Sequence, residues 1–436
     1  MSLDERYERV LREIKRPNMD HAIRLLQCLV VVTRPLLVGE LAEVLAVDFD
    51  KPDGIPKLNA SWRWEDQEQA LLSSCSSLIV IVNVKDYNDE EEYVSGDDDD
   101  NENDNEKGEN HAQIVQFSHF SVKEFLTSPR LVTPSRDVSH YHIVLETAHT
   151  IMAQACLGIL LRPNDRDDQA VVGKASPLDD YAAQHWVTHA QFGSVSFRLR
   201  TAMECMFDVD KPYFSGWLRL HDIDTVQHDS FLRDFYLKTL LEASPLYYAA
   251  LCGFQDLVER LIVRYPQQVN AIGGVYLTPI VAALSRRHFQ LVYLLHRHGS
   301  SVDLQDCDLW SPLHCAASSG DIEMARVLVE LKADISARSR TAQTPLHATS
   351  FYGSPDCPKV ARYLLEHGAD VNARTESGIT PLHRASEYGR VEVARVLIGY
   401  GADIGAEDDS GQTPLHIASV NRLDEIVKLL LEHGAK

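Results

Sequence analysis

The second half of the chain repeats one pattern of polar and hydrophobic positions. Ser or Thr is followed by Pro and then by Leu or Ile, and the pattern begins at Ser244, Thr278, Ser311, Thr344, Thr380 and Thr413. The intervals between these positions are 34, 33, 33, 36 and 33 residues. Ser or Thr caps a helix and Pro fits its first turn, so each copy predicts the start of a helix. Apolar positions then recur at helical spacing before Gly368, Gly401 and Gly434, which predicts a second helix in each repeat.

A period of 33 residues with Thr-Pro-Leu-His at the start of a helix resembles the ankyrin repeat. The resemblance implies six repeats over residues 243–436, stacked so that first helices and turn tips line a concave face. The motif histidines are then expected to brace the repeats by hydrogen bonding. Two early repeats depart, with Tyr247 and Val281 at the His position and Arg287 at the expected inter-helix Gly. Three extra residues after Gly353 are expected in the loop between the helices of the fourth repeat.

The first part of the chain has a different pattern. Apolar residues at helical spacing predict three helices, over residues 3–14, 18–33 and 39–45. Continuous apolar runs predict two strands, over residues 78–84 and 114–118. Three helices followed by a hairpin are the order of a winged helix, so we interpret residues 1–130 as a winged-helix-like domain.

Residues 131–242 carry three further helical patterns, at 142–161, 178–192 and 194–207. We interpret this segment as a helical connector. The expected fold is therefore mainly α: a winged helix with a small β-hairpin, a helical connector, and an ankyrin solenoid of six repeats.

The charge of the chain is concentrated in one segment. The net charge is −22, and Lys85 to Glu109 hold 13 acidic residues and two lysines. We expect residues 85–110 to form a disordered acidic hairpin loop. The third predicted helix carries Glu40 and Glu43 and no basic residue, so it and the loop should repel phosphate. An acidic chain also gains nothing from counterion release, so we expect neither nucleic acid nor an anionic membrane as partner.

The cysteines and the chain start bear on the compartment. Eight cysteines are scattered without a C-x-x-C pair, which is typical of reduced thiols in a cytosolic or nuclear protein. The first residues are charged and include no signal-peptide core, and the apolar runs are too short for a membrane span. We expect a cytoplasmic protein, with a nuclear location as the open alternative.

Several motifs together resemble a larger architecture. They are Arg34-Pro35-Leu36, the stretch from Phe117 to Leu126 (FSHFSVKEFL), Tyr181 to Trp186 (YAAQHW), and Pro245 to Gly253 (PLYYAALCG). They are similar to the winged-helix and ankyrin portions that follow the nucleotide-binding NACHT module in fungal STAND, or NLR-like, ankyrin proteins. The resemblance implies that His119 contacts the β-phosphate of ADP, and that a NACHT-type ATPase module is a partner in cis or in trans. This sequence contains no G-x-x-x-x-G-K-[ST] loop, so the alternative is a hydrogen-bonded structural histidine at position 119.

Catalytic and metal-binding patterns fail on inspection. His185 and His189 are four residues apart on a predicted helix and could reach one ion, but they lack the Glu of H-E-x-x-H. His140, His142 and His149 lie close in sequence without a ligand spacing. G-x-S-x-G is absent, since the stretch from Gly193 to Phe197 fails at its last position. We therefore expect no catalytic residue, no cofactor, no metal and no enzyme activity.

The repeat surface is where we expect function. On the ankyrin geometry, the partner-binding candidates are Asp308, Trp310, Arg340, Gln343, Phe351, Tyr352, Ile379, Glu387, Tyr388 and Gln412. Trp, Tyr and Arg dominate interface hot spots, and Trp310, Phe351, Tyr352 and Tyr388 fall on consecutive repeats. They form an exposed aromatic strip or, alternatively, fill gaps between repeats. The predicted function is protein–protein recognition as the sensor and scaffold of an NLR-like signalling protein, and the alternative is a stand-alone ankyrin adaptor that presents clients to another enzyme.

Overall fold

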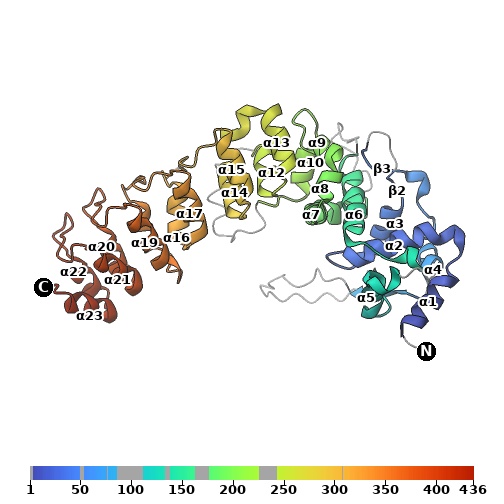
Figure 1. Ribbon diagram of the computed structural model, residues 1–436, viewed down its shortest axis with the longest axis horizontal. Helices are drawn as coiled ribbons and strands as arrows, with labels where there is room; N and C mark the ends of the chain where they lie inside the picture. Colours follow the sequence, from blue (N-terminus) through green and yellow to red (C-terminus); the bar gives the residue numbers. More distant parts are fainter. Residues whose placement is uncertain are drawn as a thin grey trace, which may run out of the picture. The chain divides into compact units, whose positions relative to one another are not determined.

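The chain consists of two compact units. The computed structural model describes residues 3–49, 54–75, 77–85, 111–132, 138–162, 176–224, 243–306 and 308–436. The first unit spans Met1–Asp229 and the second Ser230–Lys436. Helices dominate both, as Figure 1 shows, and the described strands all lie in the first unit.

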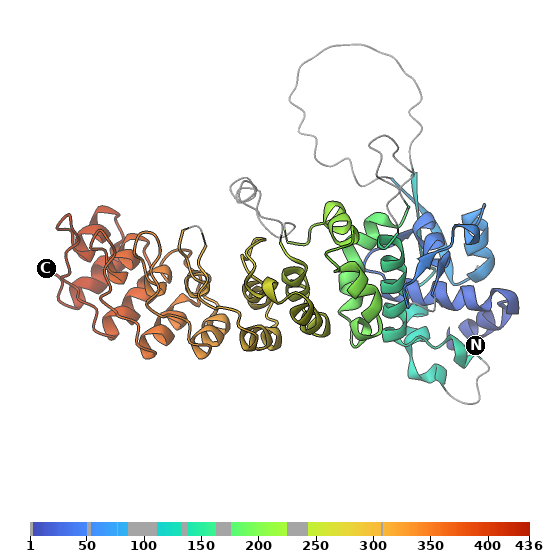
Figure 2. The ribbon, with the colours of Figure 1, turned by 90° about the horizontal axis from the view of Figure 1, so that it is seen from above.

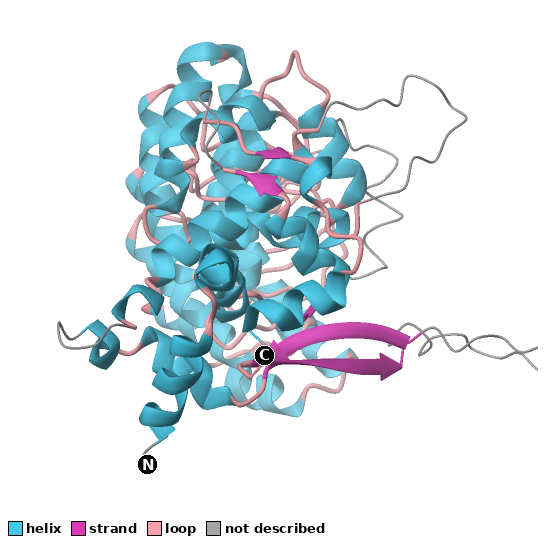
Figure 3. Ribbon diagram, turned by 90° about the vertical axis from the view of Figure 1, so that its right-hand side faces the viewer, coloured by secondary structure: helices cyan, strands magenta, loops and turns pink. Residues whose placement is uncertain are grey.

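The first unit begins with four helices and a small sheet. The helices are α1 (Leu3–Glu13), α2 (Met19–Val31), α3 (Val38–Leu45) and α4 (Gln67–Cys75). The sheet strands are β1 (Leu36–Leu37), β4 (Ile79–Lys85) and β5 (His111–Phe117). The strands pair antiparallel in the order β1-β5-β4, with Ile79 opposite Phe117 and Leu36 opposite Val115. Figure 3 shows the β4–β5 hairpin in magenta, and β2 (Val47–Asp48) pairs separately with β3 (Lys57–Leu58).

The predicted helices and both predicted hairpin strands are present, but the sequence analysis missed several elements. Helix α4 is only weakly amphipathic in sequence, and β1, β2 and β3 are two residues long, too short for a periodic signal. The predicted disordered acidic segment, residues 85–110, lies outside the described residues apart from Lys85.

The rest of the first unit is helical. It comprises α5 (Phe120–Thr127), α6 (Leu145–Leu160), α7 (Asp179–Ala190), α8 (Val195–Arg198), α9 (Arg200–Met206) and α10 (Tyr213–Leu220). Helix α6 packs against α2 and α7. An aromatic core joins α7 to α10: the rings of Trp186 and Trp217 meet edge to face at 5.2 Å, and Trp217 Nε1 donates to the Ala183 carbonyl at 3.0 Å. The helix predicted over 194–207 is broken at Leu199 into α8 and α9.

The described residues of the second unit form six helix pairs, which confirms the predicted ankyrin repeats. In chain order they are α12 (Pro245–Leu251) and α13 (Gln255–Arg264), α14 (Pro279–Ser285) and α15 (Phe289–Arg297), α16 (Pro312–Ser319) and α17 (Ile322–Glu330), α18 (Pro345–Ala348) and α19 (Cys357–Glu366), α20 (Pro381–Glu387) and α21 (Val391–Gly399), α22 (Pro414–Val420) and α23 (Asp424–Glu432). Figure 2 shows these pairs following one another within the unit. Gly368, Gly401 and Gly434 end second helices with φ of 97°, 85° and 94°, the left-handed conformation that glycine adopts without strain.

The fourth repeat accommodates its extra residues as predicted. Helix α18 is only four residues long, and α19 starts at Cys357, so the insertion lies in the loop between them. Among the described residues, none of the helices combines the length and the apolar character that a membrane crossing requires.

Candidate protein-binding surface of the repeats

Each motif histidine of the third, fourth and fifth repeats joins its own repeat to the next. The Nδ1 atom accepts from the backbone N–H of the capping Ser or Thr at 3.1 Å in His314, His347 and His383. The proton must then sit on Nε2, which donates to the carbonyl of the residue before the next motif at 3.0 Å in each case. We call this arrangement the histidine bridge.

Burial keeps the bridging imidazoles neutral. Desolvation lowers the pKa of His314 and His383 and lowers the pKa of His347 to about 4. A neutral ring with both nitrogens engaged has no free atom for acid–base chemistry. The expected bracing role of these histidines is therefore confirmed.

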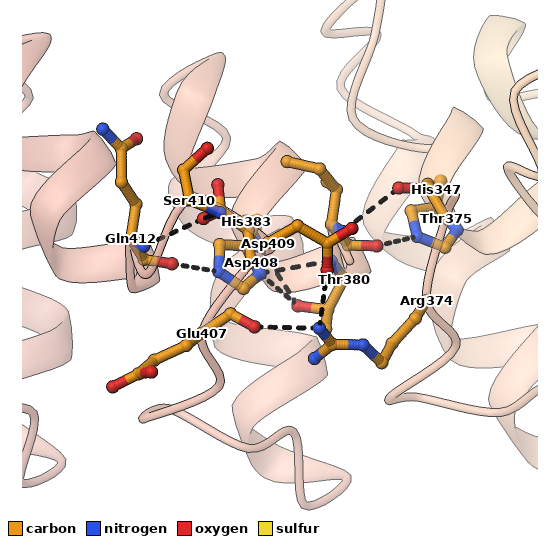
Figure 4. A network of polar contacts seen from close by, with 11 residues as sticks. His347, Arg374, Thr375, Thr380, His383, Glu407, Asp408, Asp409, Ser410 and Gln412 are labelled. Carbon is orange, nitrogen blue, oxygen red and sulfur yellow. Dashed lines mark hydrogen bonds and ion pairs between the residues drawn. The ribbon is translucent and has the colours of Figure 1, made fainter. Parts of the chain in front are cut away.

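The turn tips are held in place from repeat to repeat. In the network of Figure 4, Asp408 accepts from the backbone N–H groups of Ser410 and Gln412 at 2.8 and 2.9 Å. Arg374 donates to the carbonyl of Glu407 in the next tip at 3.0 Å. The Arg340 N–H likewise donates to the Asp308 carbonyl of the preceding tip at 2.9 Å. The tips of the third to sixth repeats are therefore linked one to the next.

Three aromatic rings form a contact ladder across the third to fifth repeats. Trp310 meets Phe351 edge to face at 5.7 Å, and Phe351 meets Tyr388 at 5.5 Å. We call Trp310, Phe351 and Tyr388 the aromatic strip. Trp310 and Phe351 are half-buried and Tyr388 is 38 % exposed, so the strip fills space between repeats and stays partly accessible to solvent. Tyr352 is 78 % exposed and stands beside the strip without a described ring contact.

The other surface candidates differ in their accessibility. Asp308, Arg340 and Gln412 are exposed, and Arg340 lies 3.9 Å from Asp308. Ile379 and Glu387 are half-buried, and Glu387 accepts from Arg384 at 2.6 Å. Gln343 is different: it is buried, and its backbone carbonyl receives the His314 bridge, so its side chain is not presented at the surface.

The arginines that support this surface were not among the predicted site residues. The Arg384 guanidinium lies 6.0 Å from the centre of the Phe351 ring, over its face. Arg390 donates to the Ser350 and Phe351 carbonyls at 3.0 and 2.7 Å and passes over Gly353, where a Cβ atom would lie 2.1 Å from it. A Gly after an aromatic pair, with an Arg in the next repeat, is a signal that sequence reasoning could have used.

A second sequence signal is that Arg338 and Arg374 occupy the same position in consecutive repeats. Arg338 donates to the Arg374 carbonyl at 2.9 Å, and Arg374 continues the ladder to the next tip. Each arginine follows an Ala and directly precedes a turn tip, as Ala337-Arg338 and Ala373-Arg374. An Ala-Arg pair at the same position of two consecutive repeats therefore indicates a series of hydrogen bonds from tip to tip.

In the first unit, His119 is held at the junction of a strand and a helix. Its Nδ1 caps α5 by accepting from the Ser121 N–H at 3.3 Å. The Ser121 hydroxyl also lies 2.6 Å from this nitrogen and 2.7 Å from the Tyr7 hydroxyl. The side chain is exposed and hydrogen-bonded, which agrees with the structural alternative for this residue.

His189 lies in a chain of hydrogen bonds inside the first unit. Its Nδ1 lies 2.9 Å from His149 Nδ1, and its Nε2 lies 2.9 Å from the Tyr181 hydroxyl. Burial lowers its pKa to about 3. Both ring nitrogens of His189 are therefore engaged within the unit, to His149 and to Tyr181. Across the part of the chain that the structure describes, no group of three or more His, Cys, Asp or Glu side chains is placed to hold a metal ion.

The expectation that the glutamates of α3 would repel phosphate from an exposed face is wrong. Glu40 and Glu43 are buried, at 1 % and 3 % exposure, and each pairs with an arginine: Glu40 with Arg34 at 2.6 Å and Glu43 with Arg63 at 2.6 Å. A buried carboxylate needs such a partner, which the helix pattern alone does not show. These residues brace α3 and do not present negative charge to solvent.

Comparisons with known proteins agree with the repeat assignment. Residues 246–339 match the family described as Ankyrin repeats (3 copies), residues 364–418 match Ankyrin repeats (many copies), and residues 343–376 and 410–436 match Ankyrin repeat. The second unit therefore carries ankyrin repeats.

The relatives are similar over different parts of the chain. Azaphilone pigments biosynthesis cluster protein L of Monascus ruber is 28 % identical over 313 residues, which cover 69 % of this chain and 60 % of that protein. Ankyrin repeat and SAM domain-containing protein 6 of Mus musculus is 32 % identical over 112 residues, 26 % of this chain and 13 % of that protein. Ankyrin repeat protein nuc-2 of Neurospora crassa is 24 % identical over 190 residues, 38 % of this chain and 18 % of that protein. The matches thus span three fifths or less of each relative.

Proposed function

We propose that this chain recognises a protein partner through the aromatic strip and the turn tips of its third to fifth repeats. Ankyrin repeats indicate a protein–protein interaction module. The observation that carries the location is the aromatic strip itself, in which three partly exposed rings of consecutive repeats are in contact. Trp, Tyr and Arg contribute most of the energy at interfaces, and here they lie together.

The rigidity of this surface supports the proposal. The histidine bridges and the arginine ladder fix the backbone below the strip before any partner arrives. A preorganised surface loses little conformational entropy on binding, so its aromatic contacts contribute more fully to affinity.

Two tyrosines of the fifth repeat provide a matched test. Tyr388 ends the first helix, beside the strip, and is 38 % exposed, whereas Tyr400 ends the second helix and is 43 % exposed. A partner is first identified by co-purification and mass spectrometry with the full chain, and its affinity is then measured by calorimetry. We expect Tyr388→Ala to weaken binding by about 30-fold, equivalent to about 2 kcal/mol, and Tyr400→Ala to leave it unchanged.

A double variant extends the test to the turn tips. Trp310→Ala with charge reversal at Arg340 should abolish binding, because it removes one ring of the strip and inverts a neighbouring exposed charge. Equal losses for Tyr388→Ala and Tyr400→Ala, or full affinity in the double variant, would contradict the proposed location.

We further propose that the chain is the sensor and scaffold part of an NLR-like signalling protein, in which the first unit relays partner binding to a NACHT-type ATPase module. Helices α1, α2 and α3, which were predicted, and the additional helix α4 precede the β4–β5 hairpin, and β1 adds to the same sheet, which supports a winged-helix interpretation. A NACHT reading frame next to this one in genomic DNA would supply the module to test. We expect that module to co-elute with this chain and to change its ATPase rate when the ankyrin partner is added.

The second candidate is a stand-alone adaptor that presents clients to another enzyme. It is favoured if the purified chain is a stable monomer, binds its partner and binds no NACHT-type module. We also propose that the chain catalyses no reaction, since the motif histidines His314, His347 and His383 are buried with both ring nitrogens engaged in bridges. ATPase or esterase turnover by the purified chain above the buffer blank would contradict this proposal.

We propose a cytoplasmic location. The cysteines of the described residues are free thiols, and most of them are buried, which supports a reducing compartment. Fluorescence imaging of the tagged full chain tests this, and a signal in the secretory pathway would contradict it.

A further inference from the structure

The junction between the second and third repeats lacks the connection found at the other junctions. Histidine bridges join the third repeat to the fourth, the fourth to the fifth and the fifth to the sixth. Between the first and second repeats Tyr247 replaces the bridge, since its hydroxyl accepts from the Tyr276 N–H at 3.1 Å. In the second repeat the same position is Val281, whose side chain has no polar atom and can form no bridge.

The missing imidazole also leaves a polar group unsatisfied. In the later repeats the hydroxyl of the capping residue lies 2.8–3.1 Å from Nδ1 of its histidine. The equivalent hydroxyl, Thr278 Oγ1, is buried and has no hydrogen-bond partner. A buried hydroxyl without a partner is unfavourable, so this junction is destabilised and also lacks a histidine bridge.

The helices also approach each other less closely at this junction. At every other junction the backbones of consecutive first helices run close together, as do those of consecutive second helices, but neither α14 with α16 nor α15 with α17 does so. The wider spacing of these ribbons can be followed in Figure 1. Since tight helix packing is what makes a repeat array stiff, this junction is the softer one.

Polar links at the rim keep the two sides together. Arg287 donates to Asp321 at 3.1 Å, and Tyr293 donates to Glu330 at 2.9 Å, both in exposed positions. At the base of the turns, the Asp334 N–H of the third repeat donates to Asp303 Oδ1 of the second at 2.9 Å. Exposed hydrogen bonds of this kind exchange readily with water. They can therefore keep the second and third repeats together without fixing the angle between them.

We propose that the ankyrin array bends at this junction, so that the first two repeats and the last four move as two rigid blocks. The aromatic strip lies entirely in the second block. Bending therefore changes the position of α12–α15 relative to the strip without disturbing the strip itself. The distance between the first block and the strip can then adjust to the size of a bound partner. This inference rests on the junction alone and does not depend on which partner the strip binds.

Distance measurements between pairs of spin labels test the proposal. Labels attached to ketone-bearing amino acids leave the native cysteines in place and can replace exposed Glu259, Glu323 and Glu392 in the full chain. The 259–392 pair crosses the junction, and the 323–392 pair lies within the second block. We expect the first distance distribution to be at least about twice as broad as the second, because only the first includes the bend.

Two substitutions assign the cause. Val281→His should narrow the 259–392 distribution to the width of the 323–392 pair, because it restores the bridge and satisfies Thr278. His347→Val, which removes a bridge inside the second block, should broaden the 323–392 distribution. Equal widths in the wild-type chain overturn the proposal whether or not the variants fold, and a 259–392 width unchanged by a folded Val281→His overturns the role of the missing bridge.

Discussion

The two units bury histidines in different ways. In the second unit, His383 bonds to Thr380 three residues before it and to a backbone carbonyl 29 residues after it, and the same geometry recurs in two other repeats. In the first unit, His189 bonds to His149, 40 residues away, and to Tyr181 on its own helix. One arrangement is periodic and uses the backbone, whereas the other occurs once and joins three side chains.

The difference predicts how far the effect of a destabilising substitution extends through each unit. A repeat contacts only its neighbours, so the stability of the array is a sum of local terms. A substitution should therefore destabilise only its own repeat and the adjacent ones. The first unit has one core, in which α6 contacts α2, α7, α8 and α9, so a lesion there should loosen helices far apart in sequence. The following predictions test this contrast, from the largest expected effect to the smallest.

Trp217→Ala should give the largest effect. Trp217 is fully buried against Trp186, Phe207 and Phe214. Its removal should lower the free energy of unfolding of the first unit by about 3–5 kcal/mol. Hydrogen exchange followed by mass spectrometry should show faster exchange in α6, α7 and α10 together, with α16–α23 unchanged. The matched control is Trp62→Ala, because Trp62 is exposed; a loss of the same size there would contradict the core assignment.

His347→Ala should weaken the array locally. It removes three hydrogen-bond contacts, two to Thr344 and one to the Ile379 carbonyl, together with buried volume, for an expected loss of about 2–4 kcal/mol in urea unfolding. His416 keeps its contacts to Thr413 but is exposed in the last described repeat, so His416→Ala should cost about 0.5 kcal/mol. Faster exchange confined to the fourth and fifth repeats would support the local model, and loss of protection throughout the array would contradict it.

The same contrast explains what could be predicted from the sequence. The repeats were predictable because each structural requirement recurs at a fixed interval: a cap, a Pro, a His and a Gly. The first unit offered no recurrence, so α4 and the pairing of Glu40 with Arg34 and Glu43 with Arg63 were missed. Such contacts depend on which helices meet in three dimensions, and a single sequence does not specify this directly.

The candidate surface was only partly predictable. Its residue types and repeat positions identified the aromatic strip, but the burial of Gln343 and the support from Arg384 and Arg390 depend on side-chain directions. Val281 was visible in the sequence as a departure from the motif. Its consequence for Thr278 became clear only from the orphaned hydroxyl.

Acid should weaken the repeats through the buried histidines. The pKa of His347 is lowered from 6.5 to about 4 by burial, so the unfolded chain binds more protons than the folded one between these values. Stability is then fully present above pH 6.5 and is lost as the pH falls toward 4, with about 2 kcal/mol lost by pH 5 from this residue. Urea unfolding at pH 7 and pH 5 measures this loss. His347→Ala should show a loss about 2 kcal/mol smaller, and an identical pH dependence would contradict the assignment.

Val281→His should give the smallest effect, and it is a gain. The imidazole would accept from the Thr278 hydroxyl through Nδ1 and donate from Nε2 toward the Trp310 carbonyl, as its counterparts do in later repeats. We expect the free energy of unfolding to rise by about 1 kcal/mol.

Two further variants separate the contributions. Thr278→Val removes the orphaned hydroxyl without adding a bridge, and Val281→Leu does neither. If the gain came from satisfying Thr278 alone, Thr278→Val would match Val281→His; if the bridge contributes, Val281→His exceeds it, and Val281→Leu shows no gain. A destabilised Val281→His that still folds would mean that this junction has no room for the bridge, and the first two repeats would then differ from the last four in backbone as well as in side chain.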